Sequence, residues 1–265
     1  MNALEIMKQQ APATAAMLPA ISVSDRYAFI STIDMAKELM RWGWEPASAR
    51  QTRSLHRETA RHLVRFRNPG LKTQFRPGEL VLELLLENSH NGRCSLRFLA
   101  GLWRVLCGNG LVAGVLDLGK LMIRHVGSPA QVATAAAQAS AARASEIFDV
   151  VKTAKTIELT EFKAREFAVA ASTLAWPMAK SRPEAVALLK PRRKMDEASD
   201  LWTTFNVIQE NLTRGGIGFQ QQFQMRRGQP RTRNAVTREV KGIARDTNLN
   251  EGLWELMKGI IKRAA

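Results

Sequence analysis

Two arginine-rich segments hold the residues with the clearest potential for binding chemistry. In the first, Glu58 is the one acidic residue between Arg50 and Arg76. Its candidate phosphate-binding residues are Arg50, Arg53, Arg57, Arg61, Arg65 and Arg67, followed by Lys72 and Arg76. Candidate stacking residues are Trp42, Trp44 and Phe66. A basic groove with aromatic platforms is typical of single-strand binding, although each aromatic alone is more typical of a core.

The second basic segment covers the run KPRRK and the stretch from Thr213 to Arg245, where Glu239 is the one acid. Guanidinium groups match phosphate oxygens bidentately, and a Gly/Gln-rich backbone can follow a nucleic-acid strand. We therefore predict a second phosphate contact here. Its candidate residues are Arg192, Arg193, Lys194, Arg214, Arg226, Arg227, Arg231, Arg233, Arg238, Lys241 and Arg245.

Arrangements that would support catalysis are weak in this sequence. His90, in NSHNGR, is a candidate general base, but Asn, Ser and Gly are also typical of a tight turn, and no GxSxG elbow accompanies it. The four histidines are scattered, and neither CxxC nor a Walker P-loop occurs. We predict a protein that is not an enzyme, with no metal and no cofactor. A nuclease using Glu83, Glu87 or Asp196 to hold magnesium remains a weaker alternative.

The composition favours a folded, basic protein. The chain has 265 residues, 45% of them hydrophobic, and its formal net charge is +15. Such a length and composition can bury a substantial core, and the charge favours a polyanionic partner. The opening residues lack the charge cluster and apolar run of a signal peptide, and no segment is typical of membrane insertion. We expect a cytoplasmic protein whose Cys94 and Cys107 are buried thiols.

The pattern of the chain predicts an α+β fold, with a small antiparallel sheet and packed helices followed by a mainly helical C-terminal half. We expect a flexible N-terminal arm over residues 1–25, an α+β core over 26–127 and a helical region over 128–265, which carries the basic linker and an arginine-rich loop. In the core, a helix from Ser31 precedes three strands containing ASARQTRS, HLVRFRN and ELVLELLLEN.

The remaining elements follow from periodicity and caps. SLRFLAGLWRVLC places Leu96, Leu99 and Trp103 on one helical stripe, so we predict a helix there, followed by strands at LVAGVL and LMIRHVG. Farther along, helices are predicted over 128–157, 160–176 and 195–214, and a last one carries Leu249 to Ile260. The stretch 217–234 has no periodicity and is predicted to be irregular.

Several sequence blocks resemble the YfjQ/YafZ-like family, proteins of bacterial prophages and plasmids that carry a domain of unknown function. The blocks are RYAFISTID, NSHNG, WRVLCGNGLV, IRHVG, PRRKMDEASDLWTTFNVIQENLTRGG and VKGIARDTNLNEGLW. The chain departs from the family at NSHNGR, where the family often has Asp-Gly-Thr, and in the Gln/Arg-rich insert before VKGI. The resemblance implies a mobile-element setting and transfers no catalytic residue. The expected element order also resembles that of phage single-strand annealing recombinases, which is a likeness of topology alone.

The charge and the aromatics together favour a non-enzymatic protein that binds or anneals single-stranded DNA in recombination, with a homo-oligomer such as a ring or filament expected. A rival hypothesis is an interaction protein that inhibits a host defence complex targeting nucleic acid. The expected partners are therefore single-stranded DNA, further copies of the chain, or a host defence or recombination protein, and not a membrane.

Overall fold

The computed structural model describes residues 2–71, 80–104, 129–224 and 230–264. The chain divides into two compact units, Met1–Ile147 and Phe148–Ala265. The division lies inside helix α3 (Pro129–Thr156), later than the boundary near residue 127 that the sequence indicated. An alanine-rich helix continues across the boundary because it has no local break signal there.

The N-terminal segment is more ordered than the loose arm that the sequence indicated. It forms α1 (Ala3–Gln10) and the 3₁₀ turn η1 (Pro12–Ala15), and the Met7 side chain is buried. The Gln10 side chain accepts a hydrogen bond from the Ala49 backbone, and Gln51 Oε1 accepts one from the Ala13 backbone. These contacts attach the segment to strand β1 (Glu45–Gln51).

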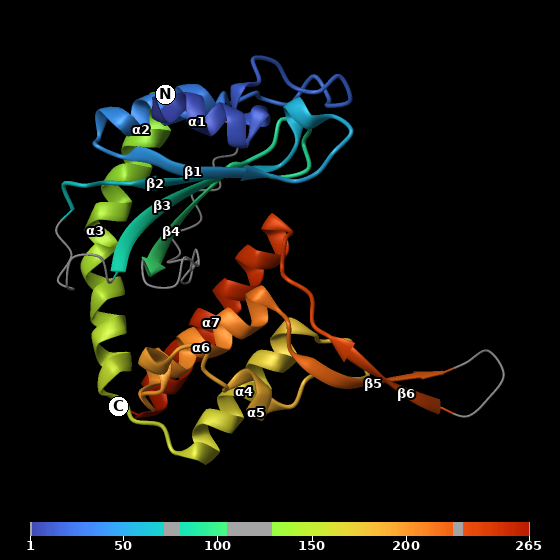
Figure 1. Ribbon diagram of the computed structural model, residues 1–265. Helices are drawn as coiled ribbons and strands as arrows, with labels where there is room; N and C mark the ends of the chain where they lie inside the picture. The colour runs from blue at the N-terminus through green and yellow to red at the C-terminus, as the bar shows by residue number, and fades with distance from the viewer. Residues whose placement is uncertain (1, 72–79, 105–128, 225–229, 265) are drawn as a thin grey trace. The chain divides into compact units, whose positions relative to one another are not determined.

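Helix α2 (Thr32–Arg41) confirms the helix predicted from Ser31. The Ser31 hydroxyl accepts a hydrogen bond from the Asp34 backbone, and the helix buries Met35 and Leu39. In Figure 1, α1 and α2 lie on the same side of the sheet. Thr32 of α2 contacts His62 of the sheet directly, so this side of the sheet is the one that packs against α2.

Four antiparallel strands form the sheet in the order β1-β2-β3-β4, which confirms the predicted antiparallel sheet. Strand β2 is His62–Arg67, β3 is Leu80–Asn88 and β4 is Arg97–Arg104. The face toward α2 is mainly apolar, whereas the opposite face carries the charged side chains. Apolar members of the first face are Val64, Phe66, Leu84, Leu86 and Phe98.

Strand β4 replaces the helix that the sequence predicted there. The segment is apolar at successive positions because both of its faces are buried, and such a run fits a helix as well as a buried strand. Gly101 fits the packed sheet, since a Cβ at this position would lie 2.5 Å from Leu85 Cδ1. Leu106, Cys107 and the strands predicted at LVAGVL and LMIRHVG lie outside the described residues.

The second unit is mainly helical, as predicted. It contains α4 (Glu161–Ala175), α5 (Ala185–Leu188), the turn η4 (Lys194–Asp196), α6 (Leu201–Arg214) and α7 (Ile243–Ala264), together with the end of α3. The rings of Trp202 and Phe205 stack at 5.5 Å, and Trp254 of α7 meets Phe205 edge-on. These rings join α6 to α7 in the core. Within the described ranges, no helix is both long and apolar enough to cross a membrane.

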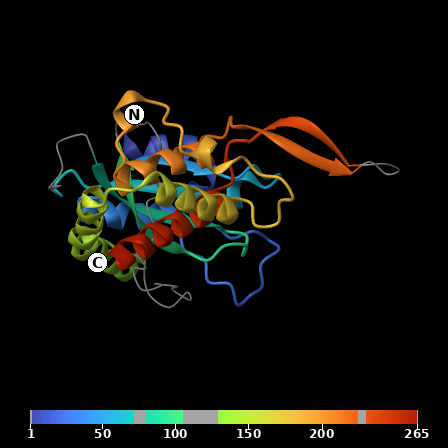
Figure 2. The same cartoon turned by 90° about the horizontal axis from the view of Figure 1, so that it is seen from below.

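A β-hairpin replaces the irregular stretch that the sequence predicted between α6 and α7. Its strands are β5 (Gly218–Gln224) and β6 (Pro230–Val236), paired antiparallel. The prediction was wrong because the repeated glutamines give the segment no alternation of polar and apolar residues. The two strands are instead held by the backbone hydrogen bonds between them. Figures 1 and 2 both show this hairpin projecting away from the helices of its own unit.

Candidate nucleic-acid interface

The arginines of β2 form ion pairs with two buried glutamates of β3. Arg65 Nη1 lies 2.5 Å from Glu83 Oε2, and Arg67 Nε lies 2.8 Å from Glu83 Oε1. Arg61 Nη2 lies 2.5 Å from Glu87 Oε1. Both glutamate side chains are fully buried, so each needs cationic partners. Each of these three arginines is thus engaged by a buried carboxylate, and Arg97 Nη1 also lies 3.8 Å from Glu87 Oε2.

These ion pairs reduce the number of arginines in the first segment that could bind a phosphate. Locally, Glu58 is the one opposing acid, but antiparallel pairing brings Glu83 and Glu87 against the same face. The Arg65 side chain is 8% exposed and has almost no surface from which to contact a phosphate. Arg61 and Arg67 are partly exposed, yet each guanidinium already contacts a carboxylate.

The other arginines of this segment differ in exposure. Arg50 is half-buried in β1, opposite Leu63 of β2. Arg53 and Arg57 lie in the connection between β1 and β2, are exposed, and have no ion pair with another described residue. Among the described members of the predicted sheet groove, these two are therefore exposed without an ion pair, and Lys72 and Arg76 lie outside the described residues.

Two of the three predicted stacking residues belong to the core. Trp44 is 1% exposed and Phe66 is fully buried, so neither ring can stack on a base. Trp42 is 45% exposed, and its Nε1 donates a hydrogen bond to Thr134 Oγ1 at 3.1 Å. Of the three, Phe66 alone lies in a strand, where it alternates with Arg65 and Arg67 because one face of β2 is apolar.

Arg192, in the KPRRK run, secures the end of helix α6. Its Nε donates to Asn211 Oδ1 at 2.8 Å, and its Nη2 donates to the Gly215 carbonyl oxygen at 2.5 Å. A helix leaves its last carbonyl groups without partners inside the helix, and a guanidinium is a suitable donor to them. This arginine has a structural role in the second unit.

Arg193 holds two buried carboxylates. It pairs with Glu210, and its Nε lies 3.5 Å from Asp196 Oδ2. Arg214 adds a second cation, since its Nη1 lies 3.3 Å from Glu210 Oε1. Asp200 caps α6, and its Oδ1 accepts a hydrogen bond from the Thr203 N–H. Lys194 is exposed and has no ion pair among the described residues.

One face of the hairpin is basic, and the sequence alone did not predict which residues share this face. Opposite residues in an antiparallel ladder share a face, so Phe219 and Gln221 lie with Ala235 and Arg233. Arg231, two residues before Arg233, lies on this same face and is exposed. The opposite face carries uncharged residues, including the Gln220–Asn234 pair.

The base of the hairpin is joined to the C-terminal end of α6 by backbone hydrogen bonds. The Gly216 N–H donates to the Thr237 carbonyl, the Thr237 N–H to the Ile217 carbonyl, and the Val240 N–H to the Thr213 carbonyl. Farther out, Ser181 Oγ accepts a hydrogen bond from the Gln222 backbone. The β5–β6 hairpin is therefore fixed by hydrogen bonds at its base and along β5.

Other predicted phosphate-binding residues of the second segment follow the hairpin in the chain. Arg238 and Arg245 are exposed and have no ion pair within the described ranges, whereas Lys241 Nζ lies 3.5 Å from Glu239 Oε2. Arg226 and Arg227 fall between β5 and β6, outside the described residues. Phe219 was missed by the sequence reasoning, although the spacing of Phe219 and Phe223 was a signal of a strand face.

His90, the candidate general base, lies inside a polar network. It is fully buried, and its Nε2 lies 3.3 Å from Thr32 Oγ1, which also contacts His62 Nε2 at 2.8 Å. Asn88 Nδ2 donates to Thr32 Oγ1 at 3.0 Å. Burial lowers the pKa of His62 to about 4, and burial with the nearby His62 lowers the pKa of His90 to about 3. This network ties α2 to β2 and the end of β3.

The carboxylates considered as magnesium ligands are engaged in ion pairs. Glu83, Glu87 and Asp196 each contact arginine, which opposes the binding of magnesium at these carboxylates. No group of three or more potential metal-binding residues occurs among the described residues. Cys94 is a free, partly exposed thiol rather than a buried one, and desolvation raises its pKa to about 11.

Comparison with known proteins places the chain in a family. A family model described as a domain of unknown function, DUF932, matches residues 20–254. The chain is 34% identical to the UPF0380 protein YafZ of Escherichia coli (strain K12) and 32% identical to the UPF0380 protein YfjQ of the same strain. Each match covers 91% of this chain and 84% of the relative. No solved structure gives a significant match. The chain therefore belongs to the DUF932 family, as its resemblance to YfjQ/YafZ-like proteins indicated.

Proposed function

We propose that this protein binds single-stranded nucleic acid, DNA in particular, through the β5–β6 hairpin and the basic residues at its base. One observation carries the proposal. The hairpin projects from the helices and presents Arg231 and Arg233 on one exposed face, in a stretch from Asn211 to Arg238 that contains no acidic residue. Both arginines are exposed.

The chemistry of that face suits a flexible polyanion. A guanidinium contacts phosphate oxygens in a planar, bidentate geometry and can also lie flat against a base. Phe219 shares the face and adds an aromatic ring near the base of the hairpin. Arginine combined with an aromatic ring is the combination that binds single strands with little sequence preference.

The exposed cations of the first unit supply a second candidate contact. Arg53 and Arg57 are exposed, whereas Arg61, Arg65 and Arg67 of the described groove pair with Glu83 or Glu87. Neutralisation of phosphate at such contacts would let two complementary strands approach, which is the physical requirement for annealing in recombination. An oligomer would multiply these contacts along one strand.

Binding measured on nuclease-treated, full-length protein tests this function. Fluorescence anisotropy with a labelled single strand and with a duplex of the same sequence, each over a salt series, reports affinity and phosphate count together. We expect the single strand to bind more tightly. Log affinity should fall with log salt by about 0.7 for each phosphate neutralised on the single strand.

The same sample separates the rival functions. Affinity that does not change with salt, or an absence of binding, would overturn the proposal. A protein that fails to bind oligonucleotide but co-purifies with a host protein would support an inhibitor of a defence complex. Strand cleavage that needs added magnesium would support the nuclease alternative.

A further inference from the structure

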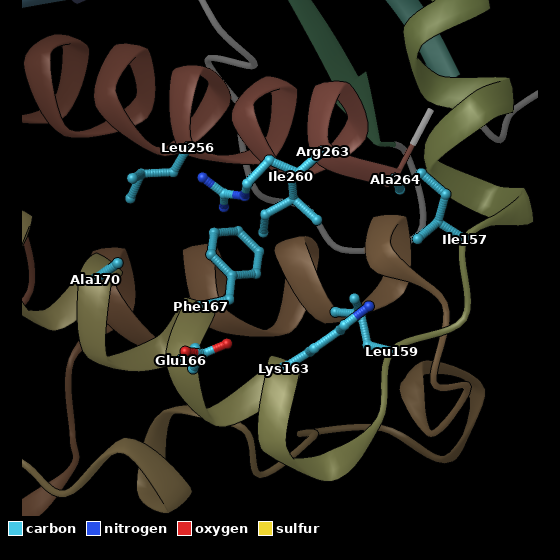
Figure 3. Close-up of a pocket in the computed structure, with 10 residues that line it drawn as sticks. All are labelled: Ile157, Leu159, Lys163, Glu166, Phe167, Ala170, Leu256, Ile260, Arg263 and Ala264. Atoms are coloured by element: carbon cyan, nitrogen blue, oxygen red, sulfur yellow. The ribbon is translucent and has the colours of Figure 1, made fainter.

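A pocket lies between α4 and α7 of the second unit. Its volume is about 490 Å³, within the range typical of sites for small ligands. Its apolar lining comes mainly from Ile157, Leu159, Phe167, Leu256 and Ile260. Figure 3 shows Ile260 and Arg263 extending from α7 toward the Phe167 ring of α4. The pocket is thus an apolar space that the packing of the two helices leaves unfilled.

Three charged side chains at the edge of this pocket are not engaged by other charges of the described protein. Lys163, Glu166 and Arg263 line the pocket and are exposed. None of the three forms an ion pair with another residue in the described ranges, although Glu161 and Glu255 on the same two helices each have a cation nearby. The edge therefore has one net positive charge beside an apolar interior.

We propose that this pocket binds an amphipathic carboxylate, such as a medium-chain fatty acid. The hydrocarbon tail would contact Phe167, Leu256 and Ile260, and its carboxylate would lie near one of the two cations, Lys163 toward one end of the lining or Arg263 toward the other (Figure 3). Burial of an apolar chain supplies the driving force, while the two cations favour an anionic head over a neutral one. This site is separate from the hairpin and does not depend on nucleic-acid binding.

The signs of the three edge charges make the proposal specific. Lys163 and Arg263 attract a carboxylate, whereas Glu166 repels it. Charges at a partly exposed edge act across a few ångströms and are screened by salt, so each contributes a several-fold change in affinity. Removal of either cation should weaken binding, and removal of the acid should strengthen it.

Methyl NMR on the full-length protein is the test, with decanoate as the probe below its aggregation concentration and decanol as the neutral analogue. We expect saturable shifts confined to the methyl groups that line the pocket, those of Ile157, Leu159, Leu256 and Ile260. Decanol should bind at least tenfold more weakly than decanoate. Equal affinities for the two probes, or shifts spread over the whole protein, would overturn the proposal, as would an absence of saturable shifts.

Three variants and a matched control complete the experiment. The double variant Lys163→Met, Arg263→Met should weaken decanoate binding at least tenfold, and Glu166→Gln should tighten it several-fold. Arg165→Met, on the same helix but outside the lining, is the control and should leave the affinity unchanged. A double variant that binds decanoate as tightly as the native protein would contradict the assigned role of the two cations.

Discussion

Arg233 donates two hydrogen bonds to Gln221 Oε1 across the β5–β6 ladder, from Nε at 3.0 Å and from Nη2 at 2.8 Å. This pair of bonds holds the guanidinium along the face of the hairpin. A donor group oriented in advance gives up less conformational entropy when it meets a phosphate. The half-buried Gln221 thus fixes the orientation of the exposed Arg233 guanidinium in the proposed interface.

The two faces of the hairpin should therefore differ in their effect on binding. The variant Arg231→Gln, Arg233→Gln should lower the affinity for single strands and reduce the slope of log affinity against log salt by about 0.7 for each phosphate that is no longer neutralised. Anisotropy over a salt series measures both quantities. The control Gln220→Ala, Asn234→Ala changes the uncharged face and should leave the slope unchanged. Equal effects of the two variants would argue against an arginine face.

Arg193 should contribute to stability rather than to binding. The variant Arg193→Ala leaves the buried carboxylates of Glu210 and Asp196 without their main cation, which should lower the free energy of unfolding by about 3–5 kcal/mol. Urea unfolding measures this decrease. The neighbouring variant Lys194→Ala removes an exposed charge and should change stability by at most about 0.5 kcal/mol. The ion-pair assignment fails if the two variants unfold alike.

Glu83 and Arg65 should show strong energetic coupling. Glu83→Gln leaves Arg65 buried beside a neutral group, and Arg65→Met leaves Glu83 with Arg67 as its remaining cation, so each single variant should be destabilised by about 3 kcal/mol or more. The double variant should be destabilised by less than the sum of the two, because neither charge is left alone. A double-mutant cycle in urea measures the coupling. Additive effects would show that the pair acts as two independent residues.

The junction between α6 and the hairpin should depend on Gly215 more than on Gly216. Both have positive φ, 66° and 82°, which costs an alanine about 1 kcal/mol. A Cβ at Gly215 would also lie 2.6 Å from the backbone of Arg238, whereas one at Gly216 would meet nothing within 4 Å. Gly215→Ala should therefore lower the melting temperature more than Gly216→Ala does. Calorimetry of the two variants makes the comparison, and equal melting temperatures would exclude the close approach.

The buried histidines should make stability fall in mild acid. The unfolded chain protonates histidine near its ordinary pKa of 6.5, but the folded protein keeps His62 neutral down to about pH 4 and His90 down to about pH 3. Their contribution is complete above about pH 6.5 and decreases as the pH falls toward these values, because only the unfolded state takes up protons in this window. Urea unfolding at several pH values measures the effect.

A pair of histidine variants identifies the source of that pH dependence. His90→Gln should reduce the slope of unfolding free energy against pH, since one of the two buried imidazoles is removed. His56→Gln changes an exposed histidine and should leave the slope as it is. The slope would have another origin if His90→Gln did not alter it.

Features that depend on neighbours along the chain could be predicted from the sequence. Ser31 and Thr160 cap the helices that follow them, and Gly215 ends α6, because a cap acts on backbone groups only a few residues away. The first three strands were predicted from alternating apolar and polar residues and from the polar or Gly/Pro breaks between them. The family was predicted from short blocks of sequence that resemble its members. The excess of positive charge is a property of the sequence itself.

The tertiary structure decided which cations are available to a ligand. Glu83 is separated from Arg65 by 18 residues and Glu210 from Arg193 by 17, so neither pairing has a local signal. Strand β4 was ambiguous because a segment buried on both faces has no period, and the hairpin emerged only from the pairing of its two strands. Burial then placed Trp44 and Phe66 in the core while leaving Arg231 and Arg233 exposed, since ion pairing and packing depend on residues that only folding brings together.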